Sequence, residues 1–230
     1  MYNTDLHLHS CLSPCADDNM TPSALVTAAR DAGLHLIALT DHNTCRNCAA
    51  AAEEAEKAGI GFIPGIEVTT QEEIHCICLF PDVAKANSFS RWLDTLLPGM
   101  AKPAPKRPMN AVQMENLKRL EERKRFYMAR QISVTELWAA AGRFNGLCYP
   151  AHVEKPYNAV YAVLGTWPDE LKADAVELCG YEEFPGELPA GLKQLHVSNA
   201  HHLWDIPKGG FPLPLETPDF AGLEKYLRGK

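Results

Sequence analysis

The chain has 230 residues, of which 46% are hydrophobic, and this length and composition fit one large α/β domain with a full core. The formal net charge of −7 argues against a general nucleic-acid-binding surface, and no apolar stretch approaches the roughly 20 residues of a membrane span. Residues 1–4 carry neither the basic region nor the apolar region of a secretory signal. We therefore expect a cytoplasmic protein whose eight cysteines are free thiols or thiolate ligands.

Residues 5–9 have the sequence Asp-Leu-His-Leu-His, an alternation of period two that is typical of a strand. Side chains two residues apart on a strand share a face and lie about 6 to 7 Å apart. His7 and His9 can therefore converge on one metal ion, while the leucines pack against whatever covers the sheet. A lone histidine on an apolar strand is usually a hydrogen-bonded core residue, but a pair preceded by Asp5 favours a metal site.

The rest of the chain predicts strands that alternate with helices. Residues 10–18 are expected to form a loop. Helices are predicted from Thr21-Pro22 to Gly33, at 45–58, at 134–144 and from Thr217-Pro218 to about Gly229. Strands are predicted at 34–39, 60–68, 74–80, 147–149, 175–178 and 195–198. This alternation implies a parallel sheet, and ligand-type residues at the carboxyl ends of its strands fit a (β/α) barrel with its site at that face.

The segment from about residue 87 to residue 132 fits the alternation poorly because it shows no strand pattern. Residues 102–108 are Pro-rich and basic, which predicts an extended or loop segment, and residues 114–130 are predicted to be helical and rich in Lys and Arg. A solvated helix face explains these charges, and a lid that offers cations to an anionic substrate is the functional alternative. We expect a single domain over residues 1–230 with an irregular or helical insertion at about 87–132.

Ligand-type residues stand in or at the end of several predicted strands. After the first strand, the segments concerned are Thr40-Asp41-His42-Asn43, Gly65-Ile66-Glu67-Val68, Glu73-Ile74-His75-Cys76, Pro150-Ala151-His152 and Ser198-Asn199-Ala200-His201. In this order the motifs resemble the PHP family, named for polymerase and histidinol phosphatase, from residue 5 to about residue 202. The resemblance implies a distorted, TIM-like (β/α)7 barrel with a metal site at the C-terminal ends of its strands.

The resemblance also implies a cluster of two or three divalent metal ions. Carried over residue by residue, His7 and His9 would bind the first metal, Glu67 would bridge to the second, His75 and His152 would complete the second, and His42 and His201 would belong to the third. Neutral imidazole and carboxylate suit borderline cations such as Zn, Mn or Fe.

Two positions depart from the family pattern. Asn199 stands where the family usually has an Asp that binds the first metal; its carbonyl oxygen can still coordinate, but it supplies no charge, so that metal should be held less tightly or the cluster should be more positive. Cys15 stands where many members have His, or an Asp one residue earlier, for the third metal. Cys15 could bind as a thiolate, Asp17 could substitute, or the third site could be empty. Asp5 is expected to orient an imidazole from outside the ligand set.

Several other histidines and cysteines are interpreted as structural, and His202, next to His201, is ambiguous. The single Cys-x-x-Cys at 45–48 is weak evidence for zinc, and its two cysteines are expected to pack inward. Cys76 and Cys78 alternate on a strand and are predicted to be in the core. His35 and His196 lie within strands without motif context.

The function predicted from the resemblance is a metal-dependent phosphoric ester hydrolase that attacks a small phosphorylated metabolite or a nucleotide with metal-activated hydroxide. Glu67 would bridge the metals, and His42 or His201 would protonate the leaving oxygen if the third metal is absent. Lys155 and Arg46 are candidate phosphate clamps, against an ordinary role as surface charges. The sequence has no motif for nucleotide-dependent transfer or serine hydrolysis, and we expect no membrane partner.

Two other functions stay open. One is an exonuclease-like phosphodiesterase on short single-stranded nucleic acid, bound through the basic residues of the segment 102–130. The other is a metal-binding PHP domain with weakened or lost catalysis, which Asn199 makes conceivable.

Overall fold

The computed structural model describes residues 1–98, 124–181, 184 and 186–229. The strands are β1 (Tyr2–Leu8), β2 (Leu36–Leu39), β3 (Gly61–Thr69), β4 (His75–Leu79), β5 (Leu147–Pro150), β6 (Ala175–Cys179), β7 (Lys193–Val197) and β8 (Phe211–Leu213). The helices are α1 (Pro22–Asp31), α2 (Cys48–Ala58), α3 (Val83–Asp94), α5 (Val134–Gly142), α6 (Val160–Leu164) and α7 (Phe220–Arg228), with a 3-10 turn at Leu203–Asp205. Six strands form one sheet in the order β5-β4-β3-β2-β1-β8, and β6 and β7 form a second sheet.

The main sheet is mixed, so the prediction of a parallel sheet holds only in part. β1 pairs parallel with β2, and β2 with β3, whereas β4 runs antiparallel to both β3 and β5. Only residues 70–74 join β3 to β4, and so short a connection makes a hairpin because a parallel crossover needs a dozen residues or more. The hairpin pairs Thr69 with His75. His75, at the start of β4, therefore lies at the same edge of the sheet as Glu67 near the end of β3.

The sheet curls into a half-barrel, and the β6–β7 pair lies near both of its ends. On one side, the backbone N–H of Asp174 donates to the carbonyl of Cys148 at 2.9 Å, joining the start of β6 to β5. On the other side, Leu8 forms a parallel bridge with Ala200, joining the end of β1 to the residues after β7. These contacts bring the ends of β1, β3, β5 and β7 to one region of the molecule.

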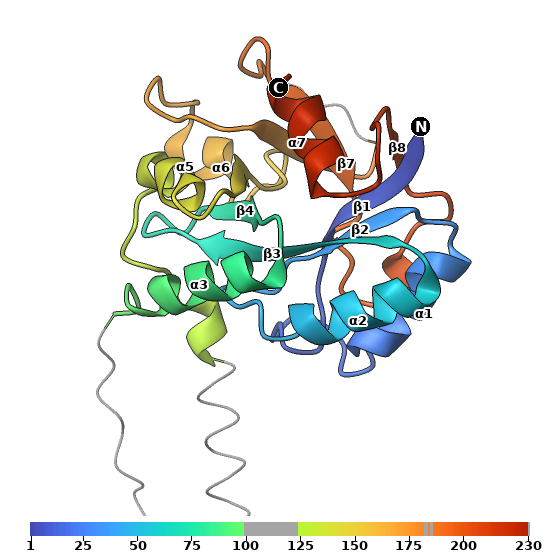
Figure 1. Cartoon of the computed structure of the whole chain (residues 1–230). Coiled ribbons are helices and arrows are strands. Elements are labelled where there is room, and N and C mark those ends of the chain that lie inside the picture. The colour runs from blue at the N-terminus through green and yellow to red at the C-terminus, as the bar shows by residue number, and fades with distance from the viewer. Residues whose placement is uncertain (99–123, 182–183, 185, 230) are drawn as a thin grey trace, which may run out of the picture.

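Apolar residues form one large cluster beneath the helices and a second cluster inside the curl. In the first, Leu25 of α1, Ala51 of α2 and Phe89 of α3 pack with residues of β2 and β3, and the buried Cys45 and Cys48 lie here as predicted. Figure 1 shows α1, α2 and α3 along one side of the sheet and α7 beside β7 and β8. The second cluster contains apolar residues from all eight strands, packed with Leu223 of α7. Both faces of the sheet are therefore buried, which fixes the strand ends that carry the histidines.

A register shift in β1 breaks the alternation expected for residues 5–9. Asp5 pairs with Ile37 but Leu8 pairs with Leu39, so β1 contains one extra residue at this point, as in a β-bulge. Accordingly, Leu6 packs in the cluster inside the curl, whereas Leu8 packs beneath the helices. The two leucines therefore lie on different faces of the sheet. The same shift means that Asp5 does not share a face with His7 and His9 as strict alternation predicted.

Several predicted boundaries differ from the observed ones. α3 begins at Val83, where the Asp82 carboxylate accepts a hydrogen bond from the N–H of Lys85, so regular structure runs into the predicted insertion at 87–132. Residues 99–123, and with them most of the predicted helix at 114–130, lie outside the described residues. α7 starts at Phe220 with Asp219 as its N-cap, rather than at Thr217. Helix α6 and strand β8 were not predicted. In the described part of the chain, no helix is long and apolar enough to cross a bilayer.

Candidate metal centre

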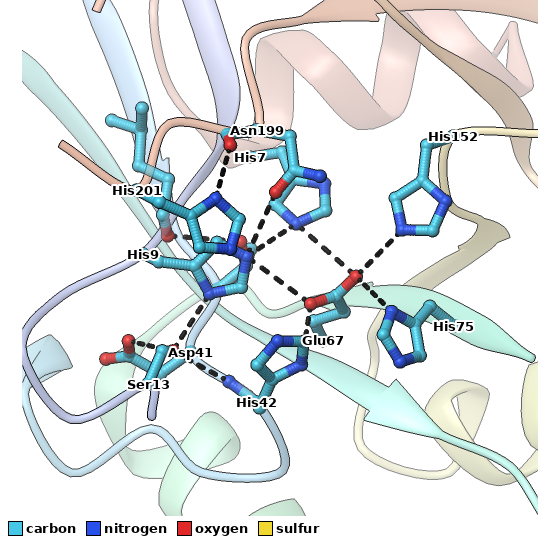
Figure 2. Close-up of polar contacts among 12 residues, drawn as sticks. His7, His9, Ser13, Asp41, His42, Glu67, His75, His152, Asn199 and His201 are labelled. Carbon is cyan, nitrogen blue, oxygen red and sulfur yellow. Dashed lines mark hydrogen bonds and ion pairs between the residues drawn. The ribbon is translucent and has the colours of Figure 1, made fainter. Parts of the chain in front are cut away.

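Glu67 is a fully buried carboxylate surrounded by histidines, and Figure 2 shows the rings turned toward it. The distances from its nearer oxygen to an imidazole nitrogen are 2.8 Å for His42, 3.0 Å for His75, 3.2 Å for His152, 3.3 Å for His9 and 3.5 Å for His7. Burial alone would raise the pKa of Glu67, but these imidazoles hold it well below its usual range. The centre of the cluster is therefore an ionised carboxylate.

The fold brings these side chains together from distant parts of the sequence. His7 and His9 lie at the end of β1, and His152 and His201 follow β5 and β7. His42 follows β2 and forms a parallel bridge with Glu67. All these residues lie at the side of the curled sheet where β1, β2, β3, β5 and β7 end. His75 lies at the same side because β4 runs antiparallel to β3 and so starts there.

A second carboxylate orients His7 from behind. Glu177, buried in β6, lies 2.8 Å from Nδ1 of His7 and also accepts the backbone N–H of His152 at 3.1 Å. Burial opposes protonation of His7, yet Glu177 and Glu67 raise the pKa of His7 to about 10. A carboxylate can only accept here, so Nδ1 carries the proton and Nε2 faces the cluster.

His9 is oriented through a serine. Ser13 Oγ donates to the buried Asp41 carboxylate at 2.6 Å and lies 2.9 Å from Nδ1 of His9. Because the serine proton points to Asp41, Ser13 accepts the proton of His9 Nδ1. The Nε2 atoms of His9 and His7 then face each other at 3.0 Å. With a pKa of about 10, His7 carries a proton on Nε2 as well and donates it to Nε2 of His9, and a metal cation would take the place of this shared proton.

The donor set fits a divalent transition metal. In the part of the chain that the structure describes, three sets of residues have one ligand atom each within 4.8 Å of one another: His7, His9 and Glu67; His42, Glu67 and His75; and His9, His42 and His201. Nδ1 of His42 and Oε2 of Glu67 lie 2.8 Å apart in the buried centre, but this contact lacks the geometry of a hydrogen bond. A cation bound by both atoms would satisfy them, because imidazole and carboxylate suit a divalent transition metal.

The cluster opens into a cavity of about 220 Å³. Its lining residues are Cys15, His42, Glu67, His75, Tyr127, His152, Lys155, Tyr157, Asn199 and His201. The amide oxygen of Asn199 lies 3.2 Å from Nε2 of His9, and Nδ1 of His201 lies 2.7 Å from the Asn199 carbonyl. The cavity therefore connects the carboxylate and its histidines with a lysine and two tyrosines.

The model of the PHP domain matches residues 5–158 of the chain, which is more than half of it. The chain belongs to the PHP domain family. Among its relatives, the 5′-3′ exoribonuclease Rnm of Salmonella typhimurium is 38% identical over 85 residues, which are 35% of this chain and 28% of that protein. The 3′,5′-nucleoside bisphosphate phosphatase of Chromobacterium violaceum is 36% identical over 88 residues, 37% of this chain and 30% of that protein. The matched segment thus spans less than a third of each relative.

A solved structure resembles this PHP chain over nearly its whole length. The lesion-specific endonuclease PfuEndoQ of Pyrococcus furiosus has a TM-score of 0.71 and 17% identity, over 99% of this chain and 56% of that one. At this identity the likeness shows the fold alone.

The structure groups the predicted ligands of the PHP chain into sets that differ in part from the sets expected for the three metals. His7, His9 and Glu67 form one set as predicted, but His42 rather than His152 joins Glu67 and His75, and His9 joins His42 and His201. His152 still contacts Glu67. His196 lies outside this cluster beside the carbonyl of Gly180.

Three further candidate residues border the cluster in different ways. Contacts with His201 and His42 outweigh burial and lower the pKa of the Cys15 thiol to about 6, so a thiolate is accessible at this position. Lys155 lines the cavity. Arg46 is exposed, its guanidinium lies 5.5 Å from the centre of the Phe126 ring, and it is not among the described residues that line the cavity.

Sequence reasoning missed the groups behind the ligands. The prediction that Asp5 orients an imidazole is wrong: its carboxylate accepts the backbone N–H groups of His7 and Ser198, because the bulge moves it out of step. Glu177 takes that role for His7. The available signal was a single acidic residue inside the apolar strand pattern Ala-Val-Glu-Leu, which is expensive to bury without a partner.

Proposed function

We propose that this chain is a metal-dependent phosphoester hydrolase that acts on a small phosphorylated metabolite or a nucleotide. The observation that carries the proposal is the buried, ionised Glu67 among five imidazoles in a member of the PHP domain family. Two or three ions of Zn, Mn or Fe are the proposed cofactors, because imidazole and carboxylate are the ligands these ions favour. We further infer the distorted seven-stranded barrel of the family, supported by the contacts that join β5 to β6 and β1 to the end of β7, and a cytoplasmic location.

The metals, when bound, would lower the pKa of a water molecule and neutralise charge on the phosphoryl oxygens. His7, His9, Glu67, His75, His152, His42 and His201 would hold them, with Asn199 and Cys15 as further candidates at the cavity wall. Lys155 would contact a phosphate oxygen, since it is the lysine that lines the cavity. If the third metal is absent, His201 or His42 would instead protonate the leaving oxygen: Nδ1 of His201 is held by the Asn199 carbonyl, so the imidazolium form of His201 would donate from Nε2.

A phosphodiesterase acting on short single-stranded nucleic acid is the second candidate. It is supported by the local similarity to an exoribonuclease. Steep loss of oligonucleotide binding with added salt would favour it, because each neutralised phosphate releases counterions. Bound metal with no phosphatase activity would instead favour a PHP domain that binds metal without catalysis.

The test is elemental analysis of the purified protein together with a panel of phosphomonoesters assayed with added Mn, Zn or Fe. We expect at least one transition metal per chain and hydrolysis of some members of the panel. The His7→Ala/His9→Ala variant should lose both metal and activity, whereas His196→Ala, which removes a histidine outside the cluster, should keep both. Unchanged metal content in the double variant would refute the assignment.

A further inference from the structure

Two exposed tyrosines stand at the wall of the metal-centre cavity. Tyr127 is 48% exposed and Tyr157 is 63% exposed, and both line the cavity together with Lys155. The ring centre of Tyr127 lies 5.5 Å from that of His42. Hydrolysis of a phosphoester assigns these aromatic rings no role, because a phosphoryl group needs only the metals and a cation.

The backbone beneath Tyr127 is held by a buried side chain. Nδ2 of Asn43 donates to the carbonyl of Phe126 at 2.6 Å, and its Oδ1 accepts the N–H of Thr69 at 3.1 Å. Asn43 directly follows His42 and has a φ of 53°, a left-handed conformation that Asn tolerates better than most residues. The same turn that presents His42 therefore also fixes the segment that carries Tyr127.

Arg130 holds this segment from the other side. Its guanidinium is 1% exposed and donates to the carbonyl of Met128 at 2.6 Å, and its backbone N–H donates to Thr69 at 2.8 Å. For this residue the predicted lid that offers cations to a substrate is wrong, since Arg130 is used to fold its own segment. The element that the segment presents to the cavity is the aromatic ring of Tyr127.

The loop that carries Tyr157 is anchored in a similar way. Nδ2 of Asn158 donates to the carbonyl of Glu73 at 2.7 Å, and the Asn158 carbonyl accepts the N–H of His75 at 2.8 Å. Both tyrosines thus project from backbone that is tied to the β3–β4 hairpin next to the metal ligands. Rigid tyrosines of this kind provide contact area at a low cost in conformational entropy.

Building on the proposed function, we propose that Tyr127 and Tyr157 bind the base of a nucleotide by stacking while its phosphate enters the cavity beside Lys155. Exposed aromatic rings favour a planar aromatic partner because stacking is tolerant of sequence and orientation. An aliphatic phosphate would leave both rings in water. The two tyrosines therefore select nucleotides, or a nucleotide at the end of a strand, over sugar phosphates.

The test compares adenosine 5′-monophosphate with ribose 5-phosphate, which differ by the base alone. Dissociation constants are measured by calorimetry on the full, metal-loaded chain with the phosphonate analogue of each ligand, so that neither ligand is hydrolysed. We expect the native protein to bind the nucleotide about tenfold more tightly, a ratio in the range of one stacked base. Tyr127→Leu and Tyr157→Leu should each reduce that ratio to about two or less, while Tyr127→Phe and Tyr157→Phe keep it.

Tyr181→Leu is the matched control, because Tyr181 is 69% exposed but lies against Phe211, with its hydroxyl bonded to the Gly210 carbonyl, outside this cavity. It should leave the ratio unchanged. Equal affinities for the two ligands in the native protein, including failure of both to bind at millimolar concentration, would overturn the proposal, as would Leu variants that keep the preference. A protein that prefers the nucleotide yet hydrolyses no phosphoester would refute the proposed function alone.

Discussion

His7 contacts two carboxylates that differ in position and role. Glu67 lies 3.5 Å from its Nε2 on the side of the cavity, whereas Glu177 lies 2.8 Å from its Nδ1 inside the protein. The inner carboxylate fixes which nitrogen carries the proton, and such partners of ligating histidines typically affect metal affinity 10- to 100-fold. Glu177 is therefore expected to influence metal affinity although it does not itself face the cavity.

We expect Glu177→Gln to weaken metal binding by about tenfold or more, because the amide oxygen still accepts the proton of Nδ1 but no longer carries a charge. The measurement is competition with a chelator, with circular dichroism to verify the fold. Glu154→Gln serves as the control, since Glu154 accepts the backbone N–H of Cys179 and no imidazole. Equal metal affinity of Glu177→Gln and the native protein would mean that the inner carboxylate does not tune the centre.

Asn199 offers a neutral oxygen where a carboxylate would bind more strongly. Its Oδ1 lies 3.2 Å from Nε2 of His9 at the cavity wall. Since charge-assisted contacts are about twice as strong as neutral ones, Asn199→Asp should bind the first metal roughly five- to tenfold more tightly. If metal occupancy limits turnover, the variant is faster at low metal; if the extra positive charge polarises the phosphoryl group, it is slower at saturation. Equal affinity in chelator competition would show that Asn199 is not a ligand.

At the scale of single elements, local sequence patterns predicted most strands and helices. They did not predict that β3 and β4 pair antiparallel, and this pairing brings His75 close to Glu67. The short link between β3 and β4 was visible in the sequence, yet the alternation of strands and helices elsewhere favoured a parallel sheet. The hairpin places His75 diagonally across from Glu67, because Thr69 pairs with His75 and Glu67 with Ile77. Most ligand positions could therefore be named from motifs, while their grouping around Glu67 depends on a pairing that the motifs do not contain.

The bulge in β1 marks a second limit of the sequence pattern. Strict alternation predicted one face for residues 5, 7 and 9, but an extra residue between Asp5 and Leu8 shifts the register against β2. Nothing in the composition of residues 5–9 marks a bulge, because no glycine or proline is present. The roles of Glu177, Ser13 and Asn43 were hidden for another reason, because each depends on a contact with a residue far away in sequence: Glu177 with His7, Ser13 with Asp41 and Asn43 with Phe126.

At the scale of the whole molecule, the metal centre joins every sector of the curled sheet. Its histidines come from β1, the turn after β2, the start of β4 and the segments after β5 and β7, from residue 7 to residue 201. A bound cation would link strands that are otherwise held together by their backbone hydrogen bonds and by the contacts of Asp174 with Cys148 and of Leu8 with Ala200. Nδ1 of His42 and Oε2 of Glu67, which lie 2.8 Å apart without hydrogen-bond geometry, are the atoms that such a cation would bind.

Metal removal should therefore lower thermal stability as well as activity. A ligand that binds only the folded state at 100 times its Kd stabilises it by about 2.7 kcal/mol. For a domain of this size that corresponds to a fall in Tm of about 5 to 10 °C when a chelator removes the metal. The measurement is calorimetry of the native protein with saturating Mn or Zn and with EDTA. His196→Ala should show the same metal-dependent difference, whereas His7→Ala/His9→Ala should lose most of it. Because His196 lies outside the cluster and His7 and His9 lie within it, a difference of similar size in all three proteins would place the stabilising ion elsewhere on the chain.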